Sequence, residues 1–551
     1  MSLRDDARTW DSATILLMLA LTIGGVGGLV VWAGARLWSW WTGNVAPMNP
    51  FELVLALTKG ELPNSVVAWG FGVGAGAAAV GLGVWVWASN VRVRKRGDDA
   101  ARLAGSGSDI EALTISAAAK KAKRLGVSAG IVGLPIGRSI AGGVELVSSF
   151  EDVGINISGP RTGKTTCWVV PRILQAPGAV VATSNKRDIV DITCPLRARG
   201  GRTWVFDPQG ICDEPRTWWW NPLRQITNAV EAKDLAQVFV DSTRAANATT
   251  NAYFDGAAQD VITALLLAGG RGNKTLRDVY RWVTDPDDRE PLRILERSGE
   301  AMAAQSLASN MGLVAETRSG VYGSAGQVLS FLLNEAALAW VEPGGAEEFI
   351  PEEFVSSSDT LYCLSQEGKG SASPIVTALT VAVVQAALVH AKAQANGRVA
   401  TPMLIELDEA ANVCRWRDLP DLYSHLGSRG ICVDTILQSW SQGAHAWGDA
   451  GIRKLWSASN VKVYGGGVSE RDFLSQLSDL IGVHYVDAVS TSTSIQGRST
   501  STSRASQQRP IATVSDLQAL PAGRAWVFAS GTPAVLAALI PFWQRDKENK
   551  S

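Results

Sequence analysis

The sequence is poor in the residues that build metal sites and disulfide frameworks. It has six cysteines and four histidines among 551 residues. The cysteines are Cys167, Cys194, Cys212, Cys363, Cys414 and Cys432. They form no Cys-x-x-Cys pair and have no metal-ligand spacing. This scatter argues against structural zinc and against a disulfide-stapled fold, and it is typical of reduced thiols in a cytoplasmic domain.

The chain also lacks an excess of either charge. Lys and Arg number 51 and Asp and Glu number 52, which leaves a net charge of −1. A protein with this balance has no global basic field to attract nucleic acid, so any such contact must be local. The length predicts two to four domains.

Two stretches contain no charged residue at all, 13–35 and 66–88, each 23 residues long. Each is long enough to cross about 30 Å of hydrocarbon as a helix. The basic cluster 92–96 follows the second stretch, which by the positive-inside tendency places both termini in the cytoplasm. We therefore expect residues 1–96 to be a multi-pass anchor in the inner (plasma) membrane. Two alternatives are buried helices of a soluble fold and a signal peptide cleaved after Ala35.

A glycine-rich loop follows the apolar run 153–157 and opens a helix-compatible segment. Its residues are Ser158, Gly159, Pro160, Arg161, Thr162, Gly163, Lys164, Thr165 and Thr166. This order of strand, loop and helix predicts a P-loop that binds ATP: backbone N–H groups hold phosphate, Lys164 adds positive charge, and the Thr165 hydroxyl ligates Mg²⁺. Ser158 stands where the pattern has its first glycine, so we expect Gly159 to take the unusual dihedrals. The alternative is an ordinary glycine turn.

A second part of the expected site follows the apolar run 403–407. Asp408 and Glu409 come at its carboxyl end, where an open parallel sheet places ligands. We expect Asp408 to bind Mg²⁺ through water and Glu409 to polarise the attacking water. The alternative is a solvated acidic pair at a strand end.

Two further side chains are candidates for catalysis. Gln438 follows another β-like run, 430–437, and is expected to sense the terminal phosphate. Arg429, just before that run, is a candidate arginine finger for a neighbouring subunit. A structural glutamine and a surface arginine are the alternatives.

The coarse organisation is α/β. Residues 97–142 are expected to be a cytoplasmic linker, and segments 143–222 and 340–545 alternate strands and helices as in a doubly wound parallel sheet. Between them, 223–339 shows helical periodicity and no strand signal, so we expect an inserted all-α domain. The Ser/Thr-rich stretch 490–508 is expected to be a loop, and 546–551 a charged tail.

Several motifs occur in one order along the chain. They are Gly-Pro-Arg-Thr-Gly-Lys-Thr-Thr (159–166), Val-Phe-Asp-Pro-Gln-Gly (205–210), Trp-Asn-Pro-Leu (220–223), Ile-Glu-Leu-Asp-Glu-Ala (405–410), Leu-Gln-Ser-Trp-Ser-Gln (437–442), Arg-Pro-Ile (509–511) and Leu-Pro (520–521). Together with the two apolar stretches, this set resembles the type IV secretion system coupling proteins, the TraG/TraD-like ATPases of conjugation. Ser158 departs from the family pattern, as does Gly427, where a basic residue often stands two positions before the Arg429 position.

The resemblance implies a RecA-like P-loop ATPase domain with an inserted all-α domain, assembled as a homo-hexamer at the inner membrane. It implies ATP hydrolysis coupled to transfer of single-stranded DNA, or of a relaxase–DNA complex, into a type IV secretion channel whose components are partners. One alternative is an ATPase that secretes protein effectors. Another is a membrane receptor for secretion substrates that is gated by nucleotide.

Overall fold

A computed structural model describes residues 97–548, with gaps at 128–129, 244–250, 369–370 and 494–499, and five single positions before residue 97. The chain divides into two compact units, 1–94 and 95–551. The two predicted membrane stretches lie outside the described residues apart from position 32, and so do residues 549–551. Within the described part, the one helix long and apolar enough to cross a membrane is α16 (Ser373–Ala393). Of its most apolar window, 72% is buried inside the second unit, as in a core helix.

The second unit is built on an eleven-stranded sheet in the order β2-β1-β15-β14-β11-β3-β10-β9-β4-β8-β5. The run from β11 to β5 is parallel, and β14, β15, β1 and β2 extend it with antiparallel pairings. The strands are β1 (Leu134–Ser139), β2 (Glu145–Ser148), β3 (Gly154–Ile157), β4 (Val180–Ser184), β5 (Thr203–Phe206), β8 (Thr360–Leu364), β9 (Met403–Leu407), β10 (Ile431–Leu437), β11 (Val461–Tyr464), β14 (Arg524–Ala529) and β15 (Val535–Ala538).

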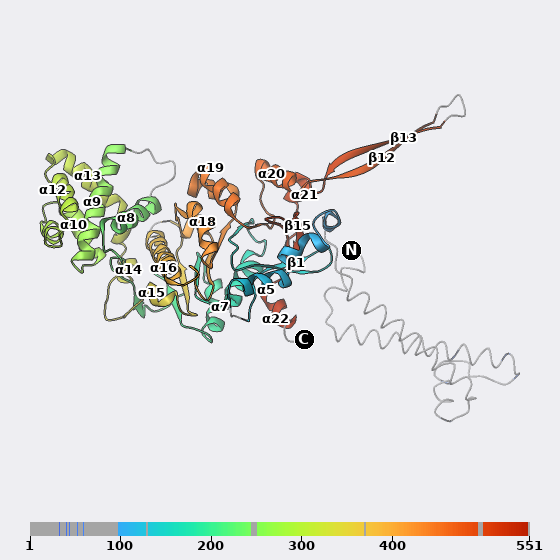
Figure 1. Cartoon of the computed structure of the whole chain (residues 1–551), viewed down its shortest axis with the longest axis horizontal. Coiled ribbons are helices and arrows are strands. Elements are labelled where there is room, and N and C mark those ends of the chain that lie inside the picture. Colours follow the sequence, from blue (N-terminus) through green and yellow to red (C-terminus); the bar gives the residue numbers. More distant parts are fainter. Residues whose placement is uncertain are drawn as a thin grey trace. The chain divides into compact units, whose positions relative to one another are not determined.

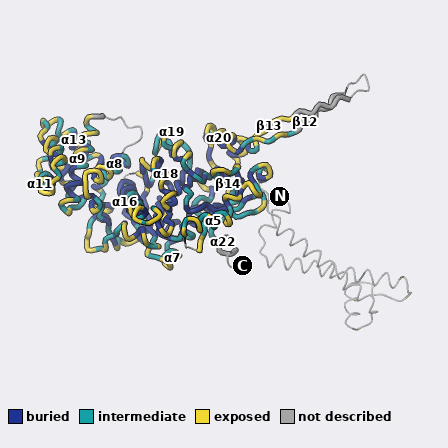
Figure 2. The backbone as a smooth tube through the Cα atoms, viewed as in Figure 1, coloured by how far each residue is buried: buried dark blue, intermediate teal, exposed yellow. Residues whose placement is uncertain are grey.

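Helices cover the sheet, and the buried core follows the central strands and α16 (Figure 2). Besides α16 they are α5 (Ile115–Arg124), the π-helical turn η3 (Thr165–Val169), α6 (Val170–Gln175), α7 (Asp188–Arg197), α15 (Pro351–Phe354), α17 (Ala410–Val413), α18 (Leu419–Ser428), α19 (Trp440–Ala458), α20 (Arg471–Ile481), α21 (Val514–Gln518) and α22 (Phe542–Glu548). Strands β8, β9 and β10 are buried along their whole length. Strands buried on both faces by helices are typical of a parallel α/β sheet, and the predicted α/β class is confirmed.

The prediction that residues 97–142 are a linker is wrong for part of the segment, because some of these residues build the antiparallel end of the sheet. Strand β1 pairs with β2 and β15. Two short 3₁₀ helices, η1 (Asp98–Arg102) and η2 (Gly107–Leu113), precede α5. Asp98 of η1 accepts hydrogen bonds from Arg524 at 2.7 and 2.9 Å. Proline and glycine inside β1 hide the alternation that identifies a strand. At the other end, α22 continues past residue 545 into the expected tail.

The segment between β6 (Trp218–Trp219) and β7 (Glu347–Glu348) is helical. Its helices are α8 (Ala229–Thr243), α9 (Ala252–Arg271), α10 (Leu276–Thr284), α11 (Glu290–Arg297), α12 (Ala301–Met311), α13 (Ala315–Val328), η4 (Ser330–Leu333) and α14 (Glu335–Ala339). Helix α9 lies at the centre of the group and contacts α8 and each of α10–α13 (Figure 1).

Both ends of this helical segment are held at one place. Strands β6 and β7 pair in parallel, and Trp220 N–H donates to the Trp340 carbonyl at 2.9 Å. The ring centroids of Trp218 lie 5.6 Å from those of Trp204 and 5.3 Å from those of Trp340. Edge-to-face aromatic pairs of this kind add about 0.5–1.5 kcal/mol each beyond the area they bury. The tryptophans here therefore build a core at the base of the helices.

The prediction that the Ser/Thr-rich stretch 490–508 is a loop is also wrong, because most of this stretch belongs to a β-hairpin. Strands β12 (Val483–Thr493) and β13 (Thr500–Pro510) pair antiparallel from Val483 opposite Pro510 to Thr493 opposite Thr500. Figure 1 shows the ribbon extending from the base of α20 and α21. Low apolar content pointed to a loop, but threonine is β-branched and favours strands, and the ladder satisfies the backbone.

Candidate active site

The glycine-rich loop follows β3, the central strand of the eleven-stranded sheet, and its carbonyls bind its own lysine. Lys164 Nζ donates to the Ser158 carbonyl at 2.7 Å and to the Gly159 carbonyl at 3.0 Å. Burial lowers the pKa of Lys164, and the carboxylates of Glu409 and Asp408 act in the opposite direction. The ammonium group therefore lies where phosphate would come, close to both acids.

Gly159 does not take the unusual dihedrals that we expected. Positive φ occurs instead at Arg161 (60°) and Gly163 (91°). Glycine at 159 is required by space: a Cβ there would lie 2.0 Å from the carbonyl oxygen of Gly467. The loop is thus pressed against the segment that follows β11.

Ser158 uses its hydroxyl to join these two segments. Its Oγ donates to Asn156 Oδ1 at 2.5 Å and accepts from the N–H of Gly465 at 3.0 Å. Gly159 N–H donates to the Gly466 carbonyl at 2.8 Å. The Ser158 hydroxyl thus joins the start of the loop to β3 and to the segment that follows β11.

Replacing Gly159 by alanine is expected to cost about 1–3 kcal/mol of stability, because the added methyl overlaps the Gly467 carbonyl. Thermal denaturation measures the loss. The matched control is Gly323→Ala in α13, where a Cβ meets nothing within 4 Å and helix propensity gains up to about 1 kcal/mol. Equal melting temperatures for the two variants would contradict the close contact.

Asp408 and Glu409 follow β9 and are both nearly buried, at 6% and 5% exposure. Burial, and next the charge of Glu409, raise the pKa of Asp408 to about 7. Among the described residues, Asp408 Oδ1 and Glu409 Oε2 have no hydrogen-bond partner. Two buried carboxylate oxygens without partners, beside Lys164, suit a hydrated Mg²⁺ and a water molecule.

Glu409 adopts a left-handed backbone conformation with φ of 53°. A non-glycine residue there costs of order 1–3 kcal/mol and is concentrated at functional sites. Its Oε1 accepts a hydrogen bond from Gln438 Nε2. Because β10 pairs with β9 on one side and β3 on the other, the expected sensor and the expected base lie together beside the loop.

Arg429 is not brought to this site. It ends α18 and precedes β10, at the amino edge of the sheet, whereas Gln438 follows the carboxyl end of the same strand. Its guanidinium donates to the Gly397 carbonyl at 2.8 Å. Space also requires glycine at position 427, since a Cβ there would lie 2.2 Å from the Glu151 carbonyl oxygen. The side chain of Arg429 therefore cannot act on the nucleotide of its own chain.

The sequence motifs did not identify two groups that lie near the site. The charge of Lys186, just after β4, lowers the pKa of Lys164, although less than burial does. The run Gly465–Gly467 contacts the loop from the other side. Two sequence features could have indicated these groups: a basic residue at the carboxyl end of a buried strand, and three consecutive glycines.

A buried ion pair lies beneath the site and connects α6 to β10. Arg172 Nε donates to Asp434 Oδ2 at 2.7 Å, and its NH1 donates to the Pro135 carbonyl at 3.2 Å. Glu406 is opposite Asp434 on β9, and its Oε2 lies 3.9 Å from Arg172 Nε. Burial, and next the charge of Asp434, raise the pKa of Glu406 well above its usual value. Arg172 thus makes its hydrogen bond to Asp434, and the raised pKa of Glu406 favours the neutral form of that side chain.

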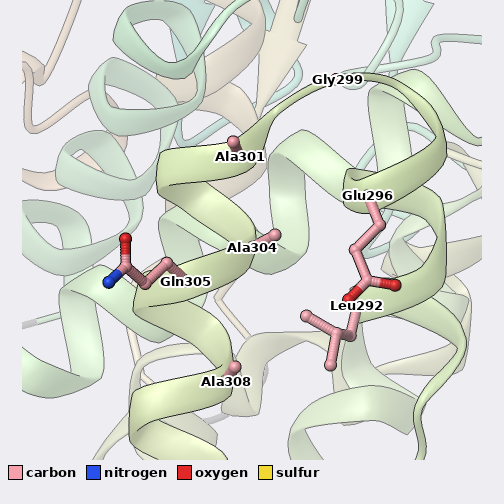
Figure 3. A pocket seen from close by; sticks show the side chains of 7 residues that line it. All are labelled: Leu292, Glu296, Gly299, Ala301, Ala304, Gln305 and Ala308. Carbon is pink, nitrogen blue, oxygen red and sulfur yellow. The ribbon is translucent and has the colours of Figure 1, made fainter.

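A separate hollow of about 360 Å³ lies between α11 and α12. Figure 3 shows Leu292 and Glu296 of α11 facing Ala304 across it. Alanines form most of its α12 wall, and Glu296 is its one charged lining residue. None of the residues that line the hollow is cationic.

Comparison with known proteins places these features in a family context. Residues 402–522, which run from β9 to the region after α21, match the family model described as the TraM recognition site of TraD and TraG. The conjugal transfer protein TraG of Agrobacterium fabrum is 24% identical over 71% of this chain and 60% of that protein. Protein VirD4 of the same organism is 27% identical over 31% of this chain and 26% of that protein. The chain therefore spans less than two thirds of these relatives.

Solved structures share the fold. The conjugative coupling protein TrwBdeltaN70 in its unbound form superposes with a TM-score of 0.53 at 16% identity, covering 77% of this chain and 92% of that one. TrwB in complex with ADP and Mg²⁺ gives the same TM-score at 17% identity, with the same coverage. The family model, the relatives and the shared fold thus confirm the resemblance to the type IV secretion coupling proteins.

Proposed function

We propose that this chain is a P-loop ATPase that couples ATP hydrolysis to transfer of single-stranded DNA, or of a relaxase–DNA complex, into a type IV secretion channel. The observation that supports the chemistry is the convergence of Lys164, Asp408, Glu409 and Gln438 at the carboxyl edge of neighbouring strands. TrwB has been solved in complex with an ATP analogue and with ADP and Mg²⁺, which supports the choice of nucleotide.

In the proposed mechanism, residues 158–166 hold the phosphates through backbone N–H groups and Lys164. Lys164 must leave the carbonyls of Ser158 and Gly159 to do so, and it exchanges them for phosphate oxygens. Thr165 and Asp408 would hold Mg²⁺, which when bound supplies positive charge to the phosphate oxygens. Glu409 orients the attacking water and accepts its proton, and Gln438 links Glu409 to the terminal phosphate.

The same proposal includes the domain organisation, the membrane anchor and the oligomeric state. We infer a RecA-like motor domain with an inserted all-α domain, anchored by two spans at 13–35 and 66–88 in the inner membrane, and a homo-hexameric ring. Arg429 serves such a ring only by reaching the site of a neighbouring subunit. The family description of residues 402–522 supports a relaxosome component such as TraM as a partner, beside the channel components.

Cargo is tested by measuring ATP turnover of the full chain with and without single-stranded DNA at two salt concentrations. We expect DNA to stimulate turnover and the apparent affinity for DNA to fall as salt rises, because phosphate contacts release counterions. Turnover without stimulation would favour an ATPase for protein effectors. ATP binding without turnover would favour the nucleotide-gated receptor.

A further inference from the structure

The six residues that follow β11, Gly465–Glu470, contact two separate parts of the candidate site. We name this segment the strap. Its first three residues are glycines that lie against the phosphate loop, as the contacts of Ser158 and Gly159 show. Val468 is buried in the core and fixes the middle of the strap.

The last residue of the strap caps the helix that follows Gln438. Glu470 Oε2 accepts from the N–H of Trp440 at 2.8 Å, and Oε1 accepts from the N–H of Ser441 at 2.9 Å. These are the first two residues of α19, whose N–H groups have no partner within the helix. A carboxylate at this end makes charge-assisted hydrogen bonds and is favoured by the helix dipole.

Gln438 is held by the same helix start. Its N–H donates to Gln442 Oε1 at 2.8 Å, and the N–H of Gln442 donates to Ser439 Oγ at 3.1 Å. Trp440 stacks on Phe473 of α20 with ring centroids 5.2 Å apart. Since α20 begins directly after Glu470, the strap, α20 and the first turn of α19 form one packed unit beneath the sensor.

We propose that Glu470 is a positioning residue for hydrolysis: through the strap it sets the place of Gln438 and Glu409 relative to the phosphate loop. This rests on the proposed function, in which Gln438 links Glu409 to the terminal phosphate. Glu470 does not touch the nucleotide position itself. A change there affects how the sensor is aimed and leaves the phosphate loop as it is.

Glu470→Gln removes the charge and one of the two acceptors while keeping the size of the side chain. The loss of one charge-assisted hydrogen bond corresponds to about a tenfold effect. We therefore expect kcat of the full chain to fall about tenfold with KM for ATP unchanged, and Glu470→Asp to recover part of kcat. Glu353→Gln is the matched control, because the Glu353 side chain is exposed on α15, and it keeps wild-type kinetics.

Hydrogen exchange of residues 438–446 gives a second readout that needs no turnover. Adding ATP is expected to protect this segment in wild type but not in Glu470→Gln. Unchanged kcat, a parallel rise of KM, or equal protection in both proteins would overturn the proposal. If wild type binds ATP without turnover, the proposed function fails, and the exchange result alone decides the role of Glu470. If Glu470→Gln does not fold, Glu470→Asp carries both measurements, with a smaller loss of kcat at unchanged KM expected.

Discussion

Replacing Glu409 by glutamine is expected to lower ATP turnover about 10²- to 10⁴-fold, which is the range that a positioned general base contributes. Glutamine keeps the size of the side chain and its bond to Gln438, but it cannot accept the proton of the attacking water. ATP binding is expected to persist, because Lys164 and the phosphate loop are untouched. Steady-state turnover and equilibrium binding of a fluorescent ATP analogue measure the two effects.

Lys164→Ala is the companion variant. It removes the cation that meets phosphate, so we expect binding and turnover to be lost together. A Glu409→Gln protein that hydrolyses ATP at the wild-type rate would refute the role of Glu409. A Glu409→Gln protein that loses binding as Lys164→Ala does would show that Glu409 belongs to the binding site and not to the hydrolytic step.

The second large effect is on stability. Arg172→Met is expected to lower the free energy of unfolding by about 3–5 kcal/mol, because it leaves the carboxylate of Asp434 buried without its cation. It also removes the donors to the Pro135 carbonyl and to Ser148 Oγ. Urea denaturation followed by circular dichroism measures the change.

Glu406→Gln is the control for that experiment. Glu406 is equally buried and lies in the same network, and its raised pKa favours the neutral form, which an amide resembles in charge. We expect the free energy of unfolding to change by less than about 1.5 kcal/mol, as for a near-isosteric substitution. A loss as large as that of Arg172→Met would mean that Glu406 carries the ionised charge.

The parallel part of the fold could be predicted because its strands are continuous apolar runs. Strand β9 has the bounds of the apolar run 403–407, and β10 covers the run 430–437 except for its first residue. Both strands are buried along their whole length, as in a parallel sheet covered by helices. The phosphate loop, the acidic pair and Gln438 follow such strands, so their meeting at one edge was predictable too. Strand β1 and the hairpin of β12 and β13 were not, because proline, glycine and a low apolar content hid their pairing.

Contacts between distant segments also could not be predicted from the sequence. Nothing local shows that Gly159 is a glycine because of Gly467, or that Glu470 caps a helix that starts 30 residues earlier. Arg429 shows the converse. Its place before a strand suggested a finger, but only the direction of β10 shows that it lies at the opposite edge from the nucleotide position.

The aromatic core at the base of the inserted helices affects how the length of the inserted segment can vary in evolution. Strands β6 and β7 pair with each other, with Trp218 opposite Glu347, so the helices between them leave and return close together. The entropy of closing such a loop grows only logarithmically, by about 0.6 kcal/mol for each doubling of its length. Helices can thus be added or removed there in the course of evolution at little cost to the sheet, provided that Trp218 and Trp340 keep the two ends together.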